Sequence, residues 1–294
     1  MKTKQKIFIA FILNLLFSIF ELFGGFITGS VAILSDAIHD FGDGLSIGLS
    51  YFLEKKSNQK PNLKYTYGYI RFSVLGGFIT SFILLIGSFI VIYNAVLRII
   101  NPITINYDVM LLFAIVGFII NLVATYFTHG GNSINQKAVN LHMLEDVLGW
   151  LVVLVGATIM RFTNFYLIDP ILSIFVALII IVTCVKNLKQ ILDIFLIKSP
   201  KDIDTNEIIN HIKNIEGVLG VHHIHIWTLD GEINCATLHI VTENYEQNIK
   251  NKVKEELKEH GISHPTIEME TLLENCKEKP CEIKKTVCHC HHHH

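Results

Sequence analysis

Long apolar runs alternate with short polar segments through the first two-thirds of the chain, whereas polar positions dominate the last third. Each of six runs is close to the roughly 20 residues that a helix needs to cross a bilayer. The runs cover about residues 6–28, 31–53, 74–97, 108–127, 140–160 and 166–185. This pattern predicts an α-helical membrane protein with six transmembrane helices within residues 1–198.

A soluble domain is predicted after Ser199-Pro200, where the composition becomes polar. Two segments have helical periodicity and three are β-rich, in the order 203–215 (helix), 219–228 and 234–242 (strands), 245–259 (helix) and 264–271 (strand). Asp204 or Thr205 is the expected N-cap of the first helix. Asp230-Gly231 predicts a hairpin turn between the first two strands. The order α-β-β-α-β predicts a small α+β domain of ferredoxin-like type over residues 199–275.

Composition and charge support a membrane location. The chain is 51% hydrophobic, and its net charge of −2 gives no indication of nucleic-acid binding. The first apolar run is too long for a signal peptide and lacks a small-residue cleavage site, so we interpret it as the first span. Lysine and arginine gather at the N-terminus, between the second and third runs, and after the sixth run. The positive-inside rule then predicts a multi-pass protein with both termini in the cytoplasm. The compactness of the chain suggests a bacterial or archaeal source, for which the plasma (inner) membrane is the expected location.

Two His-x-x-x-Asp pairs lie inside predicted spans: His39 with Asp43, and His142 with Asp146. Residues at i and i+4 share one face of a helix, so two such helices offer two imidazoles and two carboxylates. An Asp at the bilayer centre costs roughly 2.5–3.5 kcal/mol on insertion scales, which favours a functional role for these groups. The set neutralises a divalent cation and suits a tetrahedral zinc ion. Because protons compete for the same ligands, the site predicts exchange of metal for protons.

Other kinds of site explain these residues less well. Asp36 also suits a helix cap, and a lone polar residue in a span is often a helix–helix hydrogen bond. A zinc protease would need His-Glu-x-x-His, which is absent from the sequence, and a desaturase would need several His-rich boxes, so we predict no enzyme. A membrane metal sensor without transport stays open, as does a transporter that prefers iron, cobalt or cadmium.

Several segments resemble the cation diffusion facilitator family of metal efflux transporters. They are Phe11–Glu21 with Gly24-Gly25, Gly29–His39, Tyr65–Tyr69, Asn140–Asp146, Asp169–Ser173 and Val221–Trp227. The resemblance implies a homodimeric metal/proton antiporter whose transport ligands are His39, Asp43, His142 and Asp146. It also implies that Zn²⁺ is the transported substrate and a regulatory ligand. Asp40 and Glu145 stand where related sequences more often have apolar or small residues, so they are predicted, with Asp36, to be accessory.

The resemblance also implies metal binding in the cytoplasmic domain. His222 and His239 match positions that bind regulatory metal in some family members, and Glu268 and Glu270 lie where those members supply further ligands. Strand alternation predicts His222 on the same face as Ile224 and Ile226. The histidines favoured as structural are His211, His223 and His260.

The last segment, residues 276–294, is a Cys/His-rich tail. Cys288, His289 and Cys290 form a candidate tail site, since thiolates favour zinc and copper(I). Whether this tail is native or partly a tag stays open.

Overall fold

The computed structural model describes residues 3–28, 31–101, 107–130, 133–163 and 168–272. Within these ranges only the backbone is described at residues 24–28, 31–39, 107–110, 153, 157, 160–163, 168–169, 172–173 and 176. The chain divides into two compact units, Met1–Leu196 and Ile197–His294.

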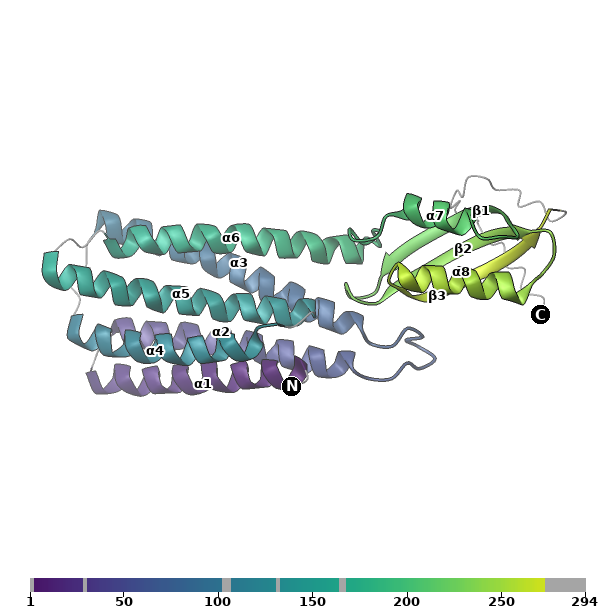
Figure 1. Cartoon of the computed structure of the whole chain (residues 1–294). Coiled ribbons are helices and arrows are strands. Elements are labelled where there is room, and N and C mark those ends of the chain that lie inside the picture. The colour runs from purple at the N-terminus through teal and green to yellow at the C-terminus, as the bar shows by residue number, and fades with distance from the viewer. Residues whose placement is uncertain (1–2, 29–30, 102–106, 131–132, 164–167, 273–294) are drawn as a thin grey trace, which may run out of the picture. The chain divides into compact units, whose positions relative to one another are not determined.

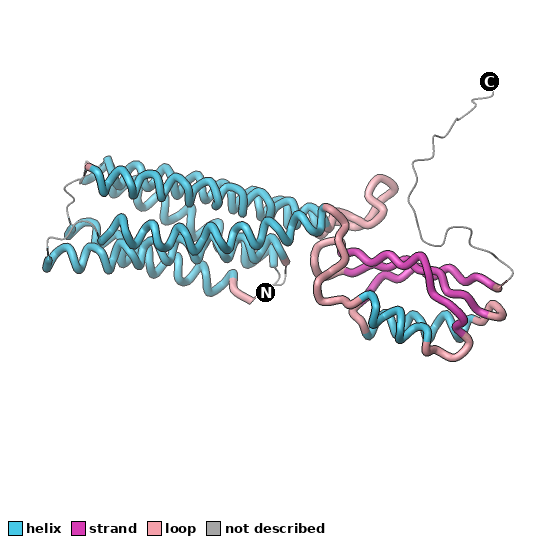
Figure 2. The backbone as a smooth tube through the Cα atoms, turned by 90° about the horizontal axis from the view of Figure 1, so that it is seen from above, coloured by secondary structure: helices cyan, strands magenta, loops and turns pink. Residues whose placement is uncertain are grey.

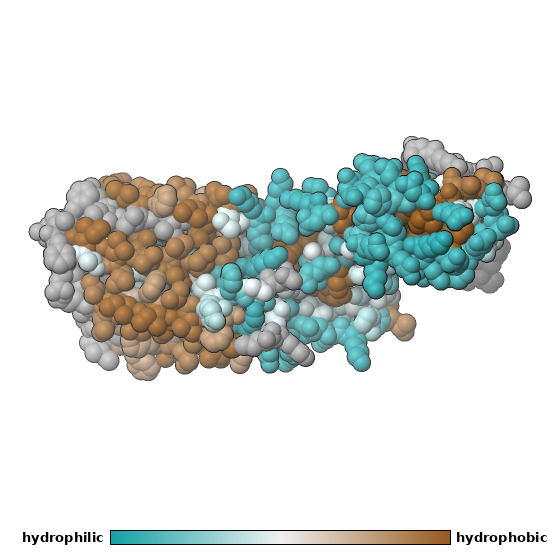
Figure 3. Space-filling model, in the orientation of Figure 1, coloured by the Kyte–Doolittle hydropathy of each residue, from teal (hydrophilic) through white to brown (hydrophobic). Residues whose placement is uncertain are grey.

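The first unit is a bundle of long helices that lie side by side (Figure 1). They are α1 (Thr3–Thr28), α2 (Val31–Ser57), α3 (Arg71–Ile100), α4 (Tyr107–Thr128), α5 (Ile134–Thr163) and α6 (Ile168–Phe195). Apolar residues cover much of the exposed surface of this unit (Figure 3). Such a surface is typical of contact with lipid.

Four segments among the described residues are long and apolar enough to cross a membrane. They are Thr3–Phe23, Arg71–Ile100, Leu111–Thr128 and Ile134–Gly156. The chain is therefore a multi-pass membrane protein. The prediction of six crossings requires two crossing segments in addition to these four, so it stays a prediction.

A buried carboxylate connects three helices of the bundle. Glu54 of α2 is 5% exposed, and its Oε2 accepts hydrogen bonds from Ser73 Oγ of α3 (2.7 Å) and Asn135 Nδ2 of α5 (3.1 Å). Asn135 also hydrogen-bonds Ser50 of α2, through the backbone carbonyl (3.0 Å) and the hydroxyl. Buried polar groups need such partners, so these residues fix α2, α3 and α5 against one another. We call this set, Ser50, Glu54, Ser73 and Asn135, the Glu54 network.

The second unit has the predicted element order. It contains α7 (Thr205–Lys213), β1 (Val218–Thr228), β2 (Asn234–Thr242), α8 (Gln247–Glu259) and β3 (Ile262–Thr271). The sheet order is β1-β2-β3; β1 and β2 are antiparallel, and β2 and β3 are parallel. Ile208 and Ile212 of α7 and Val253 and Leu257 of α8 pack with Leu238 and Ile240 of β2 in one core cluster. The sheet therefore has one face covered by helices (Figure 2).

The predicted turn joins β1 to β2. Asp230 Oδ1 accepts hydrogen bonds from the backbone amides of Glu232 (3.0 Å) and Ile233 (2.9 Å). Gly231 has φ of 96°, a conformation that glycine adopts without a side-chain clash. The Asp-Gly pair thus closes the hairpin, as predicted.

Strand β1 is not regular, and this overturns the predicted face of His222. The pairing register shifts between His222 and His225, and His223 has φ of 51°. His222 pairs with His239, which alternates with core residues of β2, whereas Ile224 and Ile226 pack into the core. The extra residue of a β-bulge reverses the alternation that we used for the prediction. His222 therefore lies on the sheet face opposite Ile224 and Ile226.

The N-cap of α7 provides a test of local stability. Asp204 Oδ1 accepts hydrogen bonds from the amides of Asn206 (2.8 Å) and Glu207 (3.4 Å). We expect Asp204→Ala to destabilise the cytoplasmic unit by about 1 kcal/mol, because it leaves these amides without their acceptor. Chemical denaturation followed by circular dichroism measures the change. Asp202→Ala removes an equally exposed carboxylate upstream of the cap and is expected to change stability by less than about 0.5 kcal/mol.

Candidate metal centre

Three of the four predicted transport ligands converge inside the helical unit. Asp43 comes from α2, and His142 and Asp146 come from α5. Each offers one ligand atom, and the three atoms lie within 4.8 Å of one another. His142 Nε2 is 3.8 Å from Asp43 Oδ2, and the two residues are 2% and 8% exposed. The i, i+4 spacing on α5 places its two ligands on the face that meets α2.

Three potential ligand atoms of this cluster, two on His142 and one on Asp146, are buried without a hydrogen bond to any described residue. These atoms are Nδ1 and Nε2 of the His142 ring and Oδ2 of Asp146. Buried polar atoms without partners cost free energy, about 1–3 kcal/mol each, so their retention in an apolar bundle requires a reason. A divalent cation coordinated by imidazole and carboxylate would satisfy these atoms, and the donor types fit zinc.

Two predicted residues fall where the structure gives only the backbone. Helix α2 includes His39 and Asp36, but their side chains lie outside the described residues. Within α2, His39 comes one turn before Asp43. Their positions therefore belong to one face of the helix.

The two accessory acids have different surroundings. Glu145 Oε1 accepts a hydrogen bond from Ser88 Oγ of α3 (3.2 Å), so this acid connects α5 to α3. Asp40 lies close enough to Asp146 for their charges to interact. Sequence reasoning missed Ser88. A serine in an apolar run usually bonds a backbone carbonyl of its own helix, and the sequence does not show when it also reaches another helix.

The cytoplasmic unit brings the predicted regulatory ligands together on the open face of its sheet. Glu270 Oε2 is 3.1 Å from His222 Nε2, and Glu270 Oε1 is 2.5 Å from His239 Nδ1. Glu268 Oε2 lies 3.9 Å from His239 Nε2 and is more exposed. The ring of His223, which we favoured as structural, lies 4.8 Å from that of His239. We call His222, His239 and Glu270 the sheet cluster.

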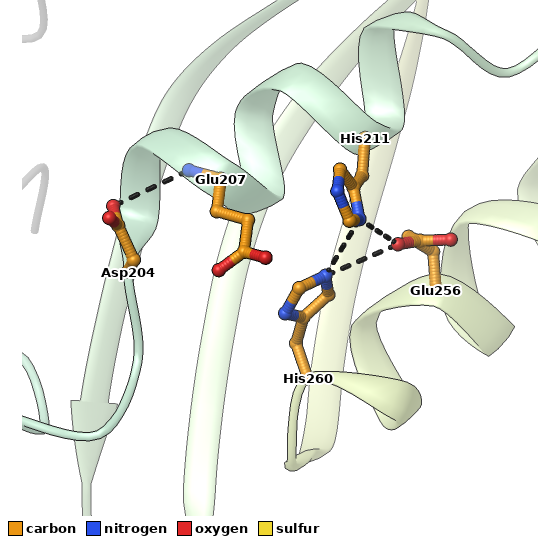
Figure 4. A network of polar contacts seen from close by, with 5 residues as sticks. All are labelled: Asp204, Glu207, His211, Glu256 and His260. Carbon is orange, nitrogen blue, oxygen red and sulfur yellow. Dashed lines mark hydrogen bonds and ion pairs between the residues drawn. The ribbon is translucent and has the colours of Figure 1, made fainter.

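A separate group connects the two helices of the same unit (Figure 4). His211 of α7 lies against Glu256 of α8 and His260, the C-cap of α8. We favoured His211 and His260 as structural, and sequence reasoning missed this group, because His211 is 45 positions from Glu256 and 49 from His260 and only the fold brings it to them. The tail residues Cys288, His289 and Cys290 lie outside the described residues.

Two family models of known proteins match this chain, one for each of its two compact units. Residues 7–196 match the family model of the cation efflux transmembrane domain, and residues 200–272 match ZT_dimer, the cytoplasmic domain of cation efflux proteins. The chain is 32% identical to a cadmium, cobalt and zinc/H(+)-K(+) antiporter of Bacillus subtilis, over 99% of this chain and 97% of that protein. It is 31% identical to the zinc transporter ZitB of Yersinia pestis, over 99% and 96% of the two chains. It is 30% identical to the metal cation efflux system protein CzcD of Cupriavidus metallidurans, over 95% and 88%.

Proposed function

Since this chain belongs to the cation efflux (cation diffusion facilitator) family of membrane transporters, we propose that it exports zinc in exchange for protons. The observation that carries the proposal is the convergence of Asp43, His142 and Asp146 in a buried cluster between two helices of the bundle. His39, one turn before Asp43 in α2, completes the proposed set of four ligands. Two imidazoles and two carboxylates around Zn²⁺ have no net charge, which suits a low-dielectric interior.

Proton exchange follows from the chemistry of the same ligands. Zinc binds the deprotonated forms of His and Asp, so protons that reach the open site compete with the ion for each ligand. A site that opens alternately to the two sides of the membrane would release zinc where protons are abundant and bind zinc where they are scarce. The imidazoles favour zinc over magnesium and calcium, whereas cobalt and cadmium also accept imidazole ligands and compete with zinc for the site.

The proposed assembly is a homodimer with six crossings per chain and both termini in the cytoplasm of the producing cell. The match of residues 200–272 to ZT_dimer supports dimerisation, and the six long helices agree with six crossings. The proposed divisions are a transport domain over residues 1–198 and a ferredoxin-like domain over residues 199–275. The sheet cluster is proposed to bind regulatory zinc, and residues 276–294 to collect metal.

Zinc flux in proteoliposomes with an imposed pH gradient tests the proposed function. We expect zinc uptake when the interior is more acidic than the exterior and dissipation of the gradient as zinc enters, because each ion displaces protons at the site. The flux should fall toward the rate of protein-free vesicles when the gradient is collapsed by a protonophore. The same assay with cobalt, cadmium and iron(II) ranks the transported ions.

Two outcomes would contradict the proposal. A zinc flux that is the same with and without the pH gradient would exclude proton exchange. Stoichiometric zinc binding without any flux would identify a membrane metal sensor in place of a transporter.

A further inference from the structure

We propose that His211, Glu256 and His260 form a zinc-binding site on the helical side of the cytoplasmic unit. We call this group the helix cluster. Its ligands come from α7 and from the C-terminal end of α8, whereas the sheet cluster uses β1, β2 and β3. The two clusters therefore share no residue.

The three donor atoms already have the spacing of zinc ligands. Glu256 Oε1 is 2.8 Å from His211 Nδ1 and 3.2 Å from His260 Nε2, and the two nitrogens are 3.1 Å apart. Ligands at about 2.05 Å in a tetrahedron lie roughly 3.3 Å from one another. An ion about 1 Å above the plane of these three atoms would reach all of them with little movement.

Hydrogen bonds alone satisfy this triangle poorly. An ionised Glu256 only accepts, and each facing ring nitrogen carries at most one proton. At most two protons are therefore available for three close contacts, and two N–H groups aimed at one oxygen bring their hydrogens together. A cation at the centre would use the lone pairs of all three atoms at once.

The surroundings also favour a positive ion. His211 belongs to the last turn of α7, and Glu256 and His260 belong to the end of α8. The C-terminal end of a helix carries partial negative charge, which stabilises a nearby cation. The His211 side chain is 46% exposed, so solvent can enter and water can serve as the fourth ligand. Three protein ligands with an open fourth position describe an accessible zinc site rather than a closed structural one.

Zinc at this position would hold α7 against α8. Apart from shared core residues such as Ile212 and Leu257, these helices are joined at their ends by this group. Because binding to the folded state stabilises the elements that supply ligands, zinc should slow the local opening of α7. The cluster thus makes the order of α7 depend on cytoplasmic zinc.

The test counts zinc ions on the full-length chain in detergent. Equilibrium dialysis against buffered Zn²⁺, followed by elemental analysis, is compared for wild type, Glu256→Gln and His211→Gln. Each substitution should lower the number of bound ions by one per chain. Glu255→Gln is the matched control, because it removes the neighbouring exposed carboxylate of the same helix, and it should retain every ion.

Hydrogen exchange supplies a second measurement that does not depend on the count. Zinc should lower the exchange rate of the Thr205–Lys213 amides at least several-fold in wild type and in Glu255→Gln, but not in Glu256→Gln or His211→Gln. Unchanged zinc stoichiometry in both cluster variants would overturn the proposal, as would an equal loss of zinc in Glu255→Gln. Retained zinc flux in the cluster variants is expected, because the transport ligands lie in the other unit.

Discussion

Replacing His142 with alanine is expected to lower the rate of zinc transport at least about 100-fold, since loss of even an outer-shell partner typically costs 10–100-fold in metal affinity. His142 is 2% exposed, and one of its ring nitrogens lies within 4.8 Å of a carboxylate oxygen of both Asp43 and Asp146, which would share the ion. Without it, Asp43 and Asp146 face each other with fewer ligands for the cation and an added cavity. Zinc flux under a pH gradient and the zinc dissociation constant from calorimetry measure the two consequences.

His129→Ala is the matched control for this experiment. His129 follows the end of α4, its side chain is exposed, and the hydrogen bond described for it, from Lys6 Nζ, goes to its backbone carbonyl. The same substitution there should leave flux within about twofold of wild type, because surface changes away from a site usually alter little. Comparable losses in both variants would mean that the transport site has been placed wrongly.

The second large effect is structural: Gly117→Ala should destabilise the helical unit by about 1–3 kcal/mol, the usual range for overpacking. A Cβ at Gly117 would lie 2.6 Å from the Trp150 ring and 2.8 Å from Phe17 Cζ. These two rings pack edge to face with centroids 5.4 Å apart, so neither can move without disturbing the other. Thermal unfolding in detergent should show a lower midpoint, by several degrees.

Gly149→Ala provides the comparison, because it adds the same methyl group to a helix of the same bundle. A Cβ at Gly149 meets no atom within 4 Å in the part of the chain that the structure describes. Alanine is the better helix former by about 1 kcal/mol, so this variant should match or exceed wild type in stability. If Gly117→Ala were as stable as Gly149→Ala, the packing of α1, α4 and α5 at this position would have to be looser than described.

Periodicity predicted the elements well wherever local chemistry determines them. The Asp204 cap and the Asp230-Gly231 turn depend on residues within four positions of each other, and both occur as expected. The His142–Asp146 pair was recognisable for the same reason, since i, i+4 spacing fixes a shared helix face before any tertiary contact forms.

Features that depend on distant partners were not predictable in this way. Glu54 directly follows the predicted span 31–53, where the sequence is equally consistent with a solvated and a buried side chain. Only the packing of α3 and α5 against α2 buries it. The bulge at His223 inverted a face that alternation had assigned. The helix cluster joins residues of α7 and α8. How these two helices are placed on the sheet relative to each other cannot be read from the sequence of either one.

The Glu54 network would also limit how the proposed transport site can open. Glu54 is 11 residues after Asp43 in α2, and Asn135 is 11 residues before Asp146 in α5. At 1.5 Å per residue, both ligands lie about 16 Å along their helices from the network. If the network stays intact, α2 and α5 can separate at the ligands only by pivoting about it, and a 7° pivot gives about 2 Å. Zinc–ligand distances tolerate about 0.2 Å, so a rotation of about 1° already weakens coordination. The buried carboxylate would then act as a hinge that converts small helix rotations into release of the ion.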